Sequence, residues 1–261
     1  MPTPPKAVVA AVLGVRAPII AGHVRPDGDC LGSMLALAVA AESAGRCARV
    51  TYRPAQVSQR LGFLLEATPH VVATPEEVAA CDAAIVLDTA RIDRAGIDPS
   101  LAELAVRGMP VINIDHHVAN PGYGTANWIV PEASSTSELV YRLLVAMGWT
   151  ITPEAASLLY AGIHTDTHGF SLPNTTASSL HAAAELVAAG AHVSDLCERL
   201  WRSQARSEFD LARVIYENTI VTADGRIAYS TARYDEITGT GCTAADIDDQ
   251  VSIPRALDGI Q

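Results

Sequence analysis

The sequence predicts an α/β protein built on a parallel β-sheet that is flanked by helices. Short runs that are apolar throughout alternate with longer Ala- and Leu-rich stretches, which is typical of strands buried on both faces and joined by helices. Hydrophobic residues make up 49% of the 261 positions, enough to fill a sizeable core. The expected strands are residues 17–24, 47–53, 82–89 and 109–115. Helices are expected at 30–45, 55–68 and 99–108.

After residue 130 the chain is predicted to be mostly helical, and then to begin a second α/β unit. Helices are expected at 134–148, 153–169, 175–190 and 193–219, with Ser/Thr caps or a Pro in the first turn as start signals. An Asp-Gly pair between two β-rich runs predicts a hairpin at 219–232. We expect a first domain at 1–190, a helical linker at 191–218 and an incomplete second domain at 219–261.

Composition excludes several classes of protein. A formal charge of −11 argues against a basic surface that holds long duplex nucleic acid. No apolar run is long enough to span a bilayer, and the Pro-rich start leads into a helix rather than a signal peptide. The five cysteines are widely spaced and form no CxxC pair. We therefore expect free thiols and a cytoplasmic location.

Polar side chains gather just past the ends of four apolar segments. Each cluster alone has an ordinary explanation: Asp29 could cap the helix that follows it, and a single histidine usually packs in a core. Parallel strands, however, end at one edge of a sheet, so the clusters that follow strands fall near one another. The four clusters are His23, Asp27 and Asp29; Asp88; Asp115, His116 and His117; and His164, Asp166 and His168.

Together these clusters predict a metal site. Carboxylates crowded at one sheet edge repel one another and are driven to protonate, a penalty that divalent cations remove. Oxygen-rich ligand sets with one or two imidazoles favour Mn²⁺ or Mg²⁺ over tetrahedral zinc.

The motifs "HVRPDGDCLGS", "VLDT", "DHH" and "GIHTDTHGF" stand in this order along the chain. In that order they resemble the DHH phosphoesterase superfamily, and within it the nanoRNase/pAp phosphatase (oligoribonuclease) branch, over roughly residues 8–255. The resemblance implies a site with two Mn²⁺ ions, for which Mg²⁺ or Co²⁺ can substitute. One ion would be held by His23, Asp27 and Asp88, and the other by Asp29, Asp88, His116 and Asp166.

Three further roles follow from the resemblance or from position. His117 would face the substrate and contact the phosphoryl group, and Asp115 would orient a histidine ring by contacting its other nitrogen. Arg25 and Arg91 lie beside metal ligands in the sequence and could bind the substrate phosphate as readily as pair locally. Ions about 3.5–4 Å apart can activate a water for in-line attack on the phosphate.

The resemblance implies a metal-dependent phosphohydrolase that cleaves short oligoribonucleotides, linear or cyclic dinucleotides of the pApA type, or pAp. It also implies a homodimer, while the lack of a long apolar run predicts no membrane partner. Two alternatives stay open. The first is another hydrolase of the superfamily, acting on pyrophosphate or small phosphate esters. The second is a nucleotide-binding module without catalysis.

The sequence departs from the family pattern in two places. His168 stands where the family usually has a small residue after "TDT". The Gly-rich "GGGH" motif of the family's C-terminal substrate (DHHA1) domain does not occur, so we expect weakened activity on dinucleotides. The stretch "SSTSE" (134–138) also matches the family, and a helix cap explains it better than a direct phosphate contact. For His164 a packing role is expected.

Overall fold

The computed structural model describes residues 2–97 and 108–260. The chain forms two compact units, each made of two segments. Unit 1 consists of Met1–Arg53 and Phe63–Leu196, and unit 2 consists of Pro54–Gly62 and Cys197–Gln261.

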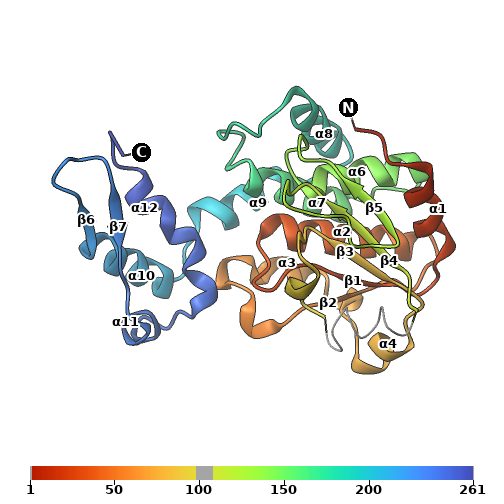
Figure 1. The fold of residues 1–261 in the computed structure, drawn as a ribbon, viewed down its shortest axis with the longest axis horizontal. Helices are drawn as coiled ribbons and strands as arrows, with labels where there is room; N and C mark the ends of the chain where they lie inside the picture. The colour runs from red at the N-terminus through yellow and green to blue at the C-terminus, as the bar shows by residue number, and fades with distance from the viewer. Residues whose placement is uncertain (1, 98–107, 261) are drawn as a thin grey trace. The chain divides into compact units, whose positions relative to one another are not determined.

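Unit 1 is built on a five-stranded sheet in which all strands are parallel (Figure 1). The strand order is β2-β1-β3-β4-β5. The four expected strands are confirmed, and β3 is buried along its whole length. The fifth strand was not predicted, because its sequence ANWI has no apolar run and only Trp128 in it is buried. The strands are β1 (Ile19–Ala21), β2 (Arg49–Thr51), β3 (Ala84–Leu87), β4 (Val111–Asp115) and β5 (Ala126–Ile129).

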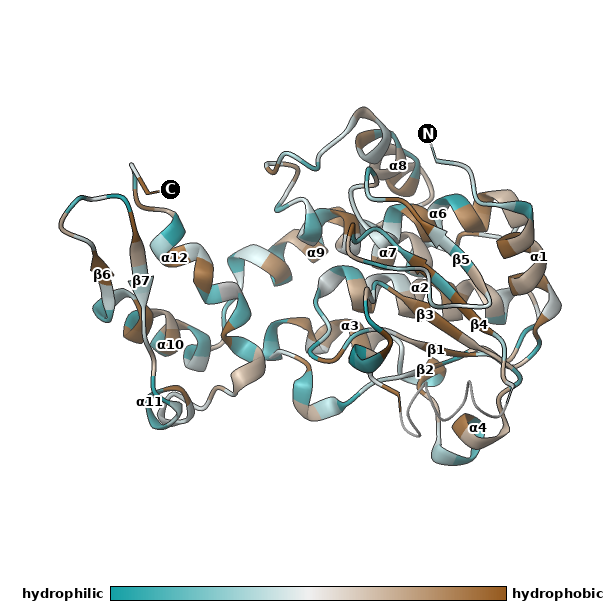
Figure 2. Cartoon of the chain, viewed as in Figure 1, coloured by the Kyte–Doolittle hydropathy of each residue, from teal (hydrophilic) through white to brown (hydrophobic). Residues whose placement is uncertain are grey.

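Helices cover both faces of this sheet. Helix α2 is buried from Gly28 to Ala41 and packs against α6 and α7. The approach to α7 is close, since a Cβ on Gly32 would lie 2.5 Å from the Leu158 carbonyl oxygen. Figure 2 shows strands β3 and β4 coloured as hydrophobic, whereas α6 and α7 carry both hydrophobic and hydrophilic residues. The helices of unit 1 are α1 (Lys6–Gly14), α2 (Gly28–Ser43), α3 (Gly62–Ala67), α4 (Pro75–Ala80), α6 (Thr136–Met147), α7 (Pro153–Asp166) and α8 (Ala177–Ala188).

Two expected helices are wrong as single elements. Residues 55–68 form two 3₁₀ turns, Pro54–Gln56 and Gln59–Leu61, before the short helix α3. Residues 193–219 divide into α9 (Val193–Cys197), a π-helical turn at Glu198–Arg202 and α10 (Arg206–Glu217). The chain can restart at α10 because the Glu208 side chain accepts the Ala205 N–H at 3.1 Å. The helix expected at 99–108 lies almost wholly outside the described residues.

Unit 2 has a small core of its own. Leu211 and Ile215 of α10 pack with Ile237 and Cys242. The predicted hairpin is present as β6 (Thr219–Val221) and β7 (Ala228–Ser230). It is followed by α11 (Tyr234–Gly239) and α12 (Ser252–Arg255).

The segment Pro54–Gly62 is tied into unit 2 by polar contacts. The Gln59 N–H donates to Asp246 Oδ1 at 2.8 Å, and Arg60 Nε lies 3.2 Å from Glu208 Oε1. The two residues of the first contact are 187 positions apart in the chain, and those of the second are 148 positions apart. No local pattern in the sequence could have indicated them.

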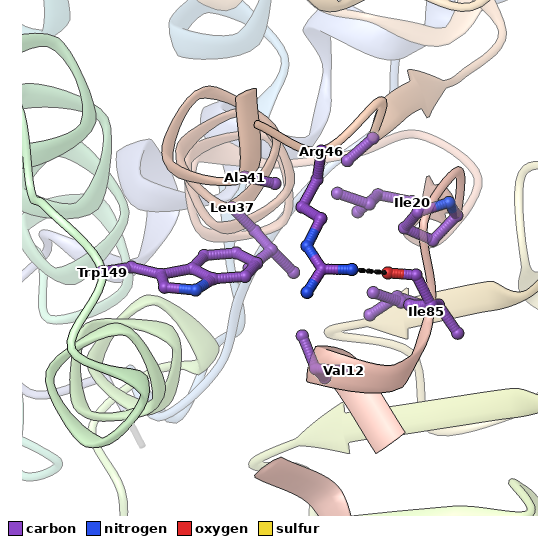
Figure 3. Close-up of a pocket in the computed structure, with 10 residues that line it drawn as sticks. Val12, Ile20, Leu37, Ala41, Arg46, Ile85 and Trp149 are labelled. Carbon is purple, nitrogen blue, oxygen red and sulfur yellow. Dashed lines mark hydrogen bonds between the residues drawn. The ribbon is translucent and has the colours of Figure 1, made fainter. Parts of the chain in front are cut away.

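A small, mainly apolar pocket lies between α1, α2 and the sheet (Figure 3). Val12, Leu37 and Trp149 line it together with the Arg46 side chain. The guanidinium of Arg46 donates to the carbonyl oxygens of Val15 and Leu13, both at 3.0 Å, at the C-terminal end of α1. Arg46 therefore completes a helix end, and the pocket carries no catalytic group.

No helix among the described residues is long and apolar enough to cross a membrane.

Candidate metal centre

The four polar clusters of the sequence meet at the C-terminal edge of the sheet. In the order β2-β1-β3 the chain reverses direction across the sheet between β1 and β3, and ligands of doubly wound folds bind at this switch point. His23 follows β1 and Asp88 follows β3 directly. The Nε2 atom of His23 lies 3.5 Å from Asp88 Oδ2.

Asp88 stands at the middle of the cluster. Its second oxygen, Oδ1, lies 3.5 Å from His116 Nε2 and 3.6 Å from His117 Nδ1, and it accepts the Thr136 hydroxyl at 3.1 Å. The side chain is almost fully buried, and the backbone holds a left-handed φ of 50°. Such a conformation is uncommon outside glycine and is concentrated at functional sites. The two oxygens of one buried carboxylate thus face different imidazoles.

Asp29 is fixed by the start of a distant helix. Its Oδ2 accepts the Thr136 N–H at 2.7 Å and its Oδ1 accepts the Ser137 N–H at 2.8 Å, at the N-terminus of α6. The ordinary explanation considered for Asp29, a cap on α2, therefore does not apply. The cap is Asp27, whose Oδ1 accepts the Cys30 N–H at 2.9 Å. A cap at Asp27 leaves Asp29 free to point inward.

His116 joins Asp29 to the last turn of α7. Its Nε2 lies 3.8 Å from Asp166 Oδ2 and 4.0 Å from Asp29 Oδ2. Asp166 in turn accepts the Asn174 side-chain amide at 3.3 Å. One ligand atom from each of Asp29, His116 and Asp166 lies within 4.8 Å of the others, close enough to share an ion.

His117 is oriented by Asp115. The imidazole Nδ1 lies 2.7 Å from Asp115 Oδ1, which also accepts the His116 N–H at 2.8 Å. This contact with Asp115 raises the pKa of His117 to about 9. Asn120, which the sequence did not single out, donates to Asp115 Oδ2 at 2.6 Å and holds the carboxylate from the other side.

The charges of the cluster call for a cation. Burial, and after it the charges of Asp88 and Asp27, hold the pKa of Asp29 well above its usual range. Burial and the charge of Asp29 raise the pKa of Asp166 to about 8. Burial by itself lowers the pKa of His23, but the contacts with Cys30, Asp27 and Asp88 outweigh it and raise that pKa far above its ordinary value. In each case the surroundings favour added positive charge, in the form of protons or metal ions.

The remaining predicted residues lie less centrally. Arg91 forms a bidentate ion pair with Asp93, with contacts of 3.0 and 2.7 Å, and its side chain is exposed. Arg25 is exposed, with a φ of 56°, so phosphate binding by either arginine stays a prediction. His168 is also exposed. His164 is stacked on Tyr160 at 5.4 Å, which confirms its packing role.

The stretch 134–138 has two roles, of which the sequence indicated one. Ser135 caps α6 by accepting the Glu138 N–H at 3.1 Å, as expected. The same turn supplies the donors to Asp29 and Asp88 that are described above. A cap signature is visible in a sequence, whereas the carboxylate that a helix start will hold is not.

Residues 18–163 match the model of the DHH family, N-terminal domain, which spans more than half of the chain. The chain belongs to the DHH family. Among its curated relatives is the bifunctional oligoribonuclease and PAP phosphatase NrnA of Thermus thermophilus, 34% identical over 97% of this chain and 73% of the relative. The NrnA of Bacillus subtilis is 30% identical over 93% of this chain and 75% of the relative.

Solved structures agree with the DHH fold. An exopolyphosphatase-related protein of Bacteroides fragilis superposes with a TM-score of 0.86 at 24% identity, and the match covers 99% of this chain and 79% of that protein. A putative family II inorganic pyrophosphatase of Methanococcus jannaschii gives a TM-score of 0.52 at 19% identity, over 86% of this chain and 75% of that protein. At these identities the likeness concerns the fold.

Proposed function

We propose that this DHH-family chain is a divalent-metal-dependent phosphohydrolase that cleaves short oligoribonucleotides, dinucleotides of the pApA type and pAp. The observation that carries the proposal is the position of Asp88. Its two oxygens lie 3.5 Å from two different imidazoles, His23 and His116. Such a carboxylate can bridge two ions, which is the arrangement used for in-line attack on phosphate esters.

The residues present fit a pair of divalent ions. We assign His23, Asp27 and Asp88 to one ion. Mutually repelling carboxylates with raised pKa values, such as the buried Asp29 and the partly buried Asp166, are a donor set that a hard cation satisfies. We assign the other ion to Asp29, Asp88, His116 and Asp166. The ion we favour is Mn²⁺, with Mg²⁺ or Co²⁺ as substitutes.

The ions, when bound, supply Lewis acidity and a nucleophilic water at neutral pH. The chain holds the ligands rigid. Asp29 cannot rotate away, because both of its oxygens accept backbone N–H groups of α6. Thr136 fixes Asp88 from the same turn. The cost of organising the site is thus met during folding rather than during the reaction.

His117 is the group we assign to the substrate. Its Nδ1 contacts Asp115, so its Nε2 is directed away from that carboxylate, and 47% of the side chain is exposed. With a pKa of about 9 the ring is protonated at neutral pH. A protonated imidazole can donate to a phosphoryl or leaving oxygen as negative charge grows there.

The substrate class rests on the relatives. Two curated relatives at 30–34% identity carry the name oligoribonuclease and PAP phosphatase, and each is matched over about three quarters of its length. The chemistry of the centre is that of phosphate ester hydrolysis in general. The choice of short nucleotides therefore comes from the relatives and not from the geometry.

The test is a hydrolysis assay with pApA, pAp, pyrophosphate and p-nitrophenyl phosphate, each with Mn²⁺ and with EDTA. We expect Mn²⁺-dependent release from pApA and pAp, with EDTA reducing it to the buffer rate. Preference for pyrophosphate would instead favour the pyrophosphatase alternative. Tight binding of pAp without turnover of any substrate at any metal concentration would contradict the proposal and favour a binding module.

A further inference from the structure

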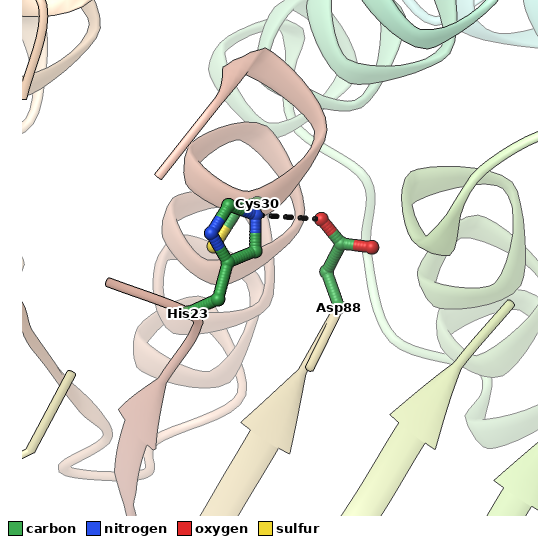
Figure 4. Close-up of side chains that lie close together, drawn as sticks. All are labelled: His23, Cys30 and Asp88. Carbon is green, nitrogen blue, oxygen red and sulfur yellow. Dashed lines mark ion pairs between the residues drawn. The ribbon is translucent and has the colours of Figure 1, made fainter. Parts of the chain in front are cut away.

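One side of the centre contains a sulfur atom that the predicted ligand set does not use. His23, Cys30 and Asp88 each offer a ligand atom, and these atoms all lie within 4.8 Å of one another. Figure 4 shows Cys30, in the first turn of α2, beside the His23 ring with Asp88 across from it. Ligands of one ion with bonds of about 2.1 and 2.3 Å can be up to about 4.4 Å apart, so a small side-chain adjustment brings all three into range.

The Cys30 thiol can lie at this place because Gly22 has no side chain. A Cβ there would lie 2.1 Å from Cys30 Sγ and 3.0 Å from Met34 Sδ. Any residue other than glycine would displace the sulfur. Cys30 has no exposed surface, so its sulfur is confined between the end of β1 and the first turns of α2, next to His23.

The surroundings of Cys30 differ from those of the other buried cysteines. Cys81 packs in an apolar cluster with Ile19 and Val78, and Cys242 packs with Leu211 and Ile237. Those two thiols behave as small hydrophobic side chains. Cys30 alone among these three has an imidazole and a carboxylate as neighbours.

We propose that Cys30 is an additional ligand of the ion at His23 and Asp88, and that its thiolate makes this position prefer transition metals over Mg²⁺. The proposal rests on the metal centre proposed above. Thiolate is a soft ligand that suits Zn²⁺, Co²⁺ and Fe²⁺, whereas carboxylates suit Mg²⁺ and Mn²⁺. The other position, with Asp29, His116 and Asp166, offers only oxygen and nitrogen. The two ions would then be chemically distinct.

Ligation requires the thiol to lose its proton. Burial raises the pKa of Cys30 to about 12. A divalent ion deprotonates a coordinating thiol outright, so the S–H proton passes to solvent as the metal–sulfur bond forms, and binding releases one proton for this ligand. No oxidant or reductant is involved.

The test is the absorption spectrum of the full chain loaded with Co²⁺ after removal of other metals. The wild-type chain should show sulfur-to-cobalt charge transfer in the near ultraviolet together with the visible ligand-field bands. Cys30→Ser and Cys30→Ala should lose the charge-transfer band and keep ligand-field bands from the other ligands. Cys81→Ser, a buried cysteine outside the centre, is the matched control and should keep both.

A second readout is the ratio of affinities for Co²⁺ and Mg²⁺, measured by calorimetry. Loss of a ligand sulfur in Cys30→Ser should lower that ratio at least ~10-fold, a fall comparable to that caused by disturbing a metal's second shell. An unchanged ratio would overturn the proposal. Should the Cys30 variants fail to fold, X-ray absorption on the wild-type chain with one Zn²⁺ decides, since a ligand sulfur scatters at about 2.3 Å.

The outcomes separate this proposal from the proposed function. Cobalt that binds the wild-type chain without a charge-transfer band, or a band that persists in Cys30→Ser, overturns the sulfur ligand and leaves the metal centre standing. Failure of the wild-type chain to bind any cobalt overturns the centre and the sulfur ligand together.

Discussion

The two compact units bury acidic side chains in different surroundings. In unit 2, Glu208 is paired with Arg60 and accepts the Ala205 N–H, and Asp246 accepts N–H groups of Gln59 and Thr243. These acids fasten the backbone together. In unit 1, the pKa of Asp29 is raised mainly by burial and next by the charges of Asp88 and Asp27. Acids that face one another are poorly arranged for stability, and such an arrangement favours the binding of cations.

The two units also differ in how many apolar side chains they bury. In unit 1 they are concentrated in the sheet and in α2, which is buried along most of its length. Unit 2 buries a small cluster and leaves many large apolar groups exposed. Stability is therefore concentrated in the unit that carries the centre. The exposed groups of unit 2 include Phe209, Tyr216, Ile220, Val221, Ile227, Tyr229 and Val251.

Replacement of Asp88 should have the largest effect on activity. Asp88→Ala removes the carboxylate shared by both proposed ions, so hydrolysis of pAp with Mn²⁺ should fall to the buffer rate while the circular dichroism spectrum is kept. Asp93→Asn is the control, because that acid is exposed and paired with Arg91. Retained turnover in Asp88→Ala would contradict the assignment of the centre to unit 1.

A substitution in the core of unit 2 should affect that unit alone. Leu211 is fully buried in the small core, and Leu211→Ala should destabilise unit 2 by about 2–5 kcal/mol. Limited proteolysis should then cut within residues 197–261 while Mn²⁺ binding persists. Phe209→Ala, at an exposed position of the same helix, should change stability by less than about 0.5 kcal/mol. Loss of Mn²⁺ binding in Leu211→Ala would break the comparison between the units.

Thr136 connects the two functions of the α6 turn. Thr136→Val removes the hydroxyl that donates to Asp88 at 3.1 Å but keeps the backbone N–H that holds Asp29. We expect kcat to fall about 10–100-fold, as for other groups that orient a metal ligand. Thr136→Ser keeps the hydroxyl and should restore most of the activity. Equal rates for the Val and Ser variants would show that this hydrogen bond is dispensable.

The pH dependence of stability should depend on metal. Folding raises the pKa of Asp29, and raises that of Asp166 to about 8, from ordinary values of 3.8. The folded chain therefore binds more protons than the unfolded chain between these values, and its stability falls as pH rises. The melting temperature of EDTA-treated protein should drop from pH 5 to pH 8, and Mn²⁺ should reverse the drop.

Asp166→Asn removes one of these acids and should flatten the pH dependence in EDTA. A melting temperature that rises over this range without metal would contradict the electrostatic account of the centre.

Much of the centre could be predicted because strand ends carry a local signal. Apolar runs located β1, β3 and β4, and the rule that parallel strands end together brought His23, Asp88 and His116 to one edge. What could not be predicted depends on contacts between distant residues. Asp29 is held by Thr136, 107 positions away, and no pattern near either residue shows this.

There are also physical reasons why the sequence did not predict two elements of the fold. Strand β5 (Ala126–Ile129) lies at the edge of the sheet and exposes part of most of its side chains, so it lacks the apolar run of the inner strands. The segment 55–68 has helical spacing, yet its first part is fixed by Asp246 and Glu208 of unit 2. The position of Cys30 beside His23 depends on Gly22, a residue whose role is visible only in three dimensions.

The measurement that tests the central claim most directly is the number of Mn²⁺ ions bound per chain, determined by titration calorimetry on the wild-type chain and on Asp88→Asn. A bridging Asp88 predicts two ions in the wild type and at most one, bound more weakly, in the variant. Asp88→Asn that binds as many ions with the same affinity, or a wild-type chain that binds none, would contradict the account.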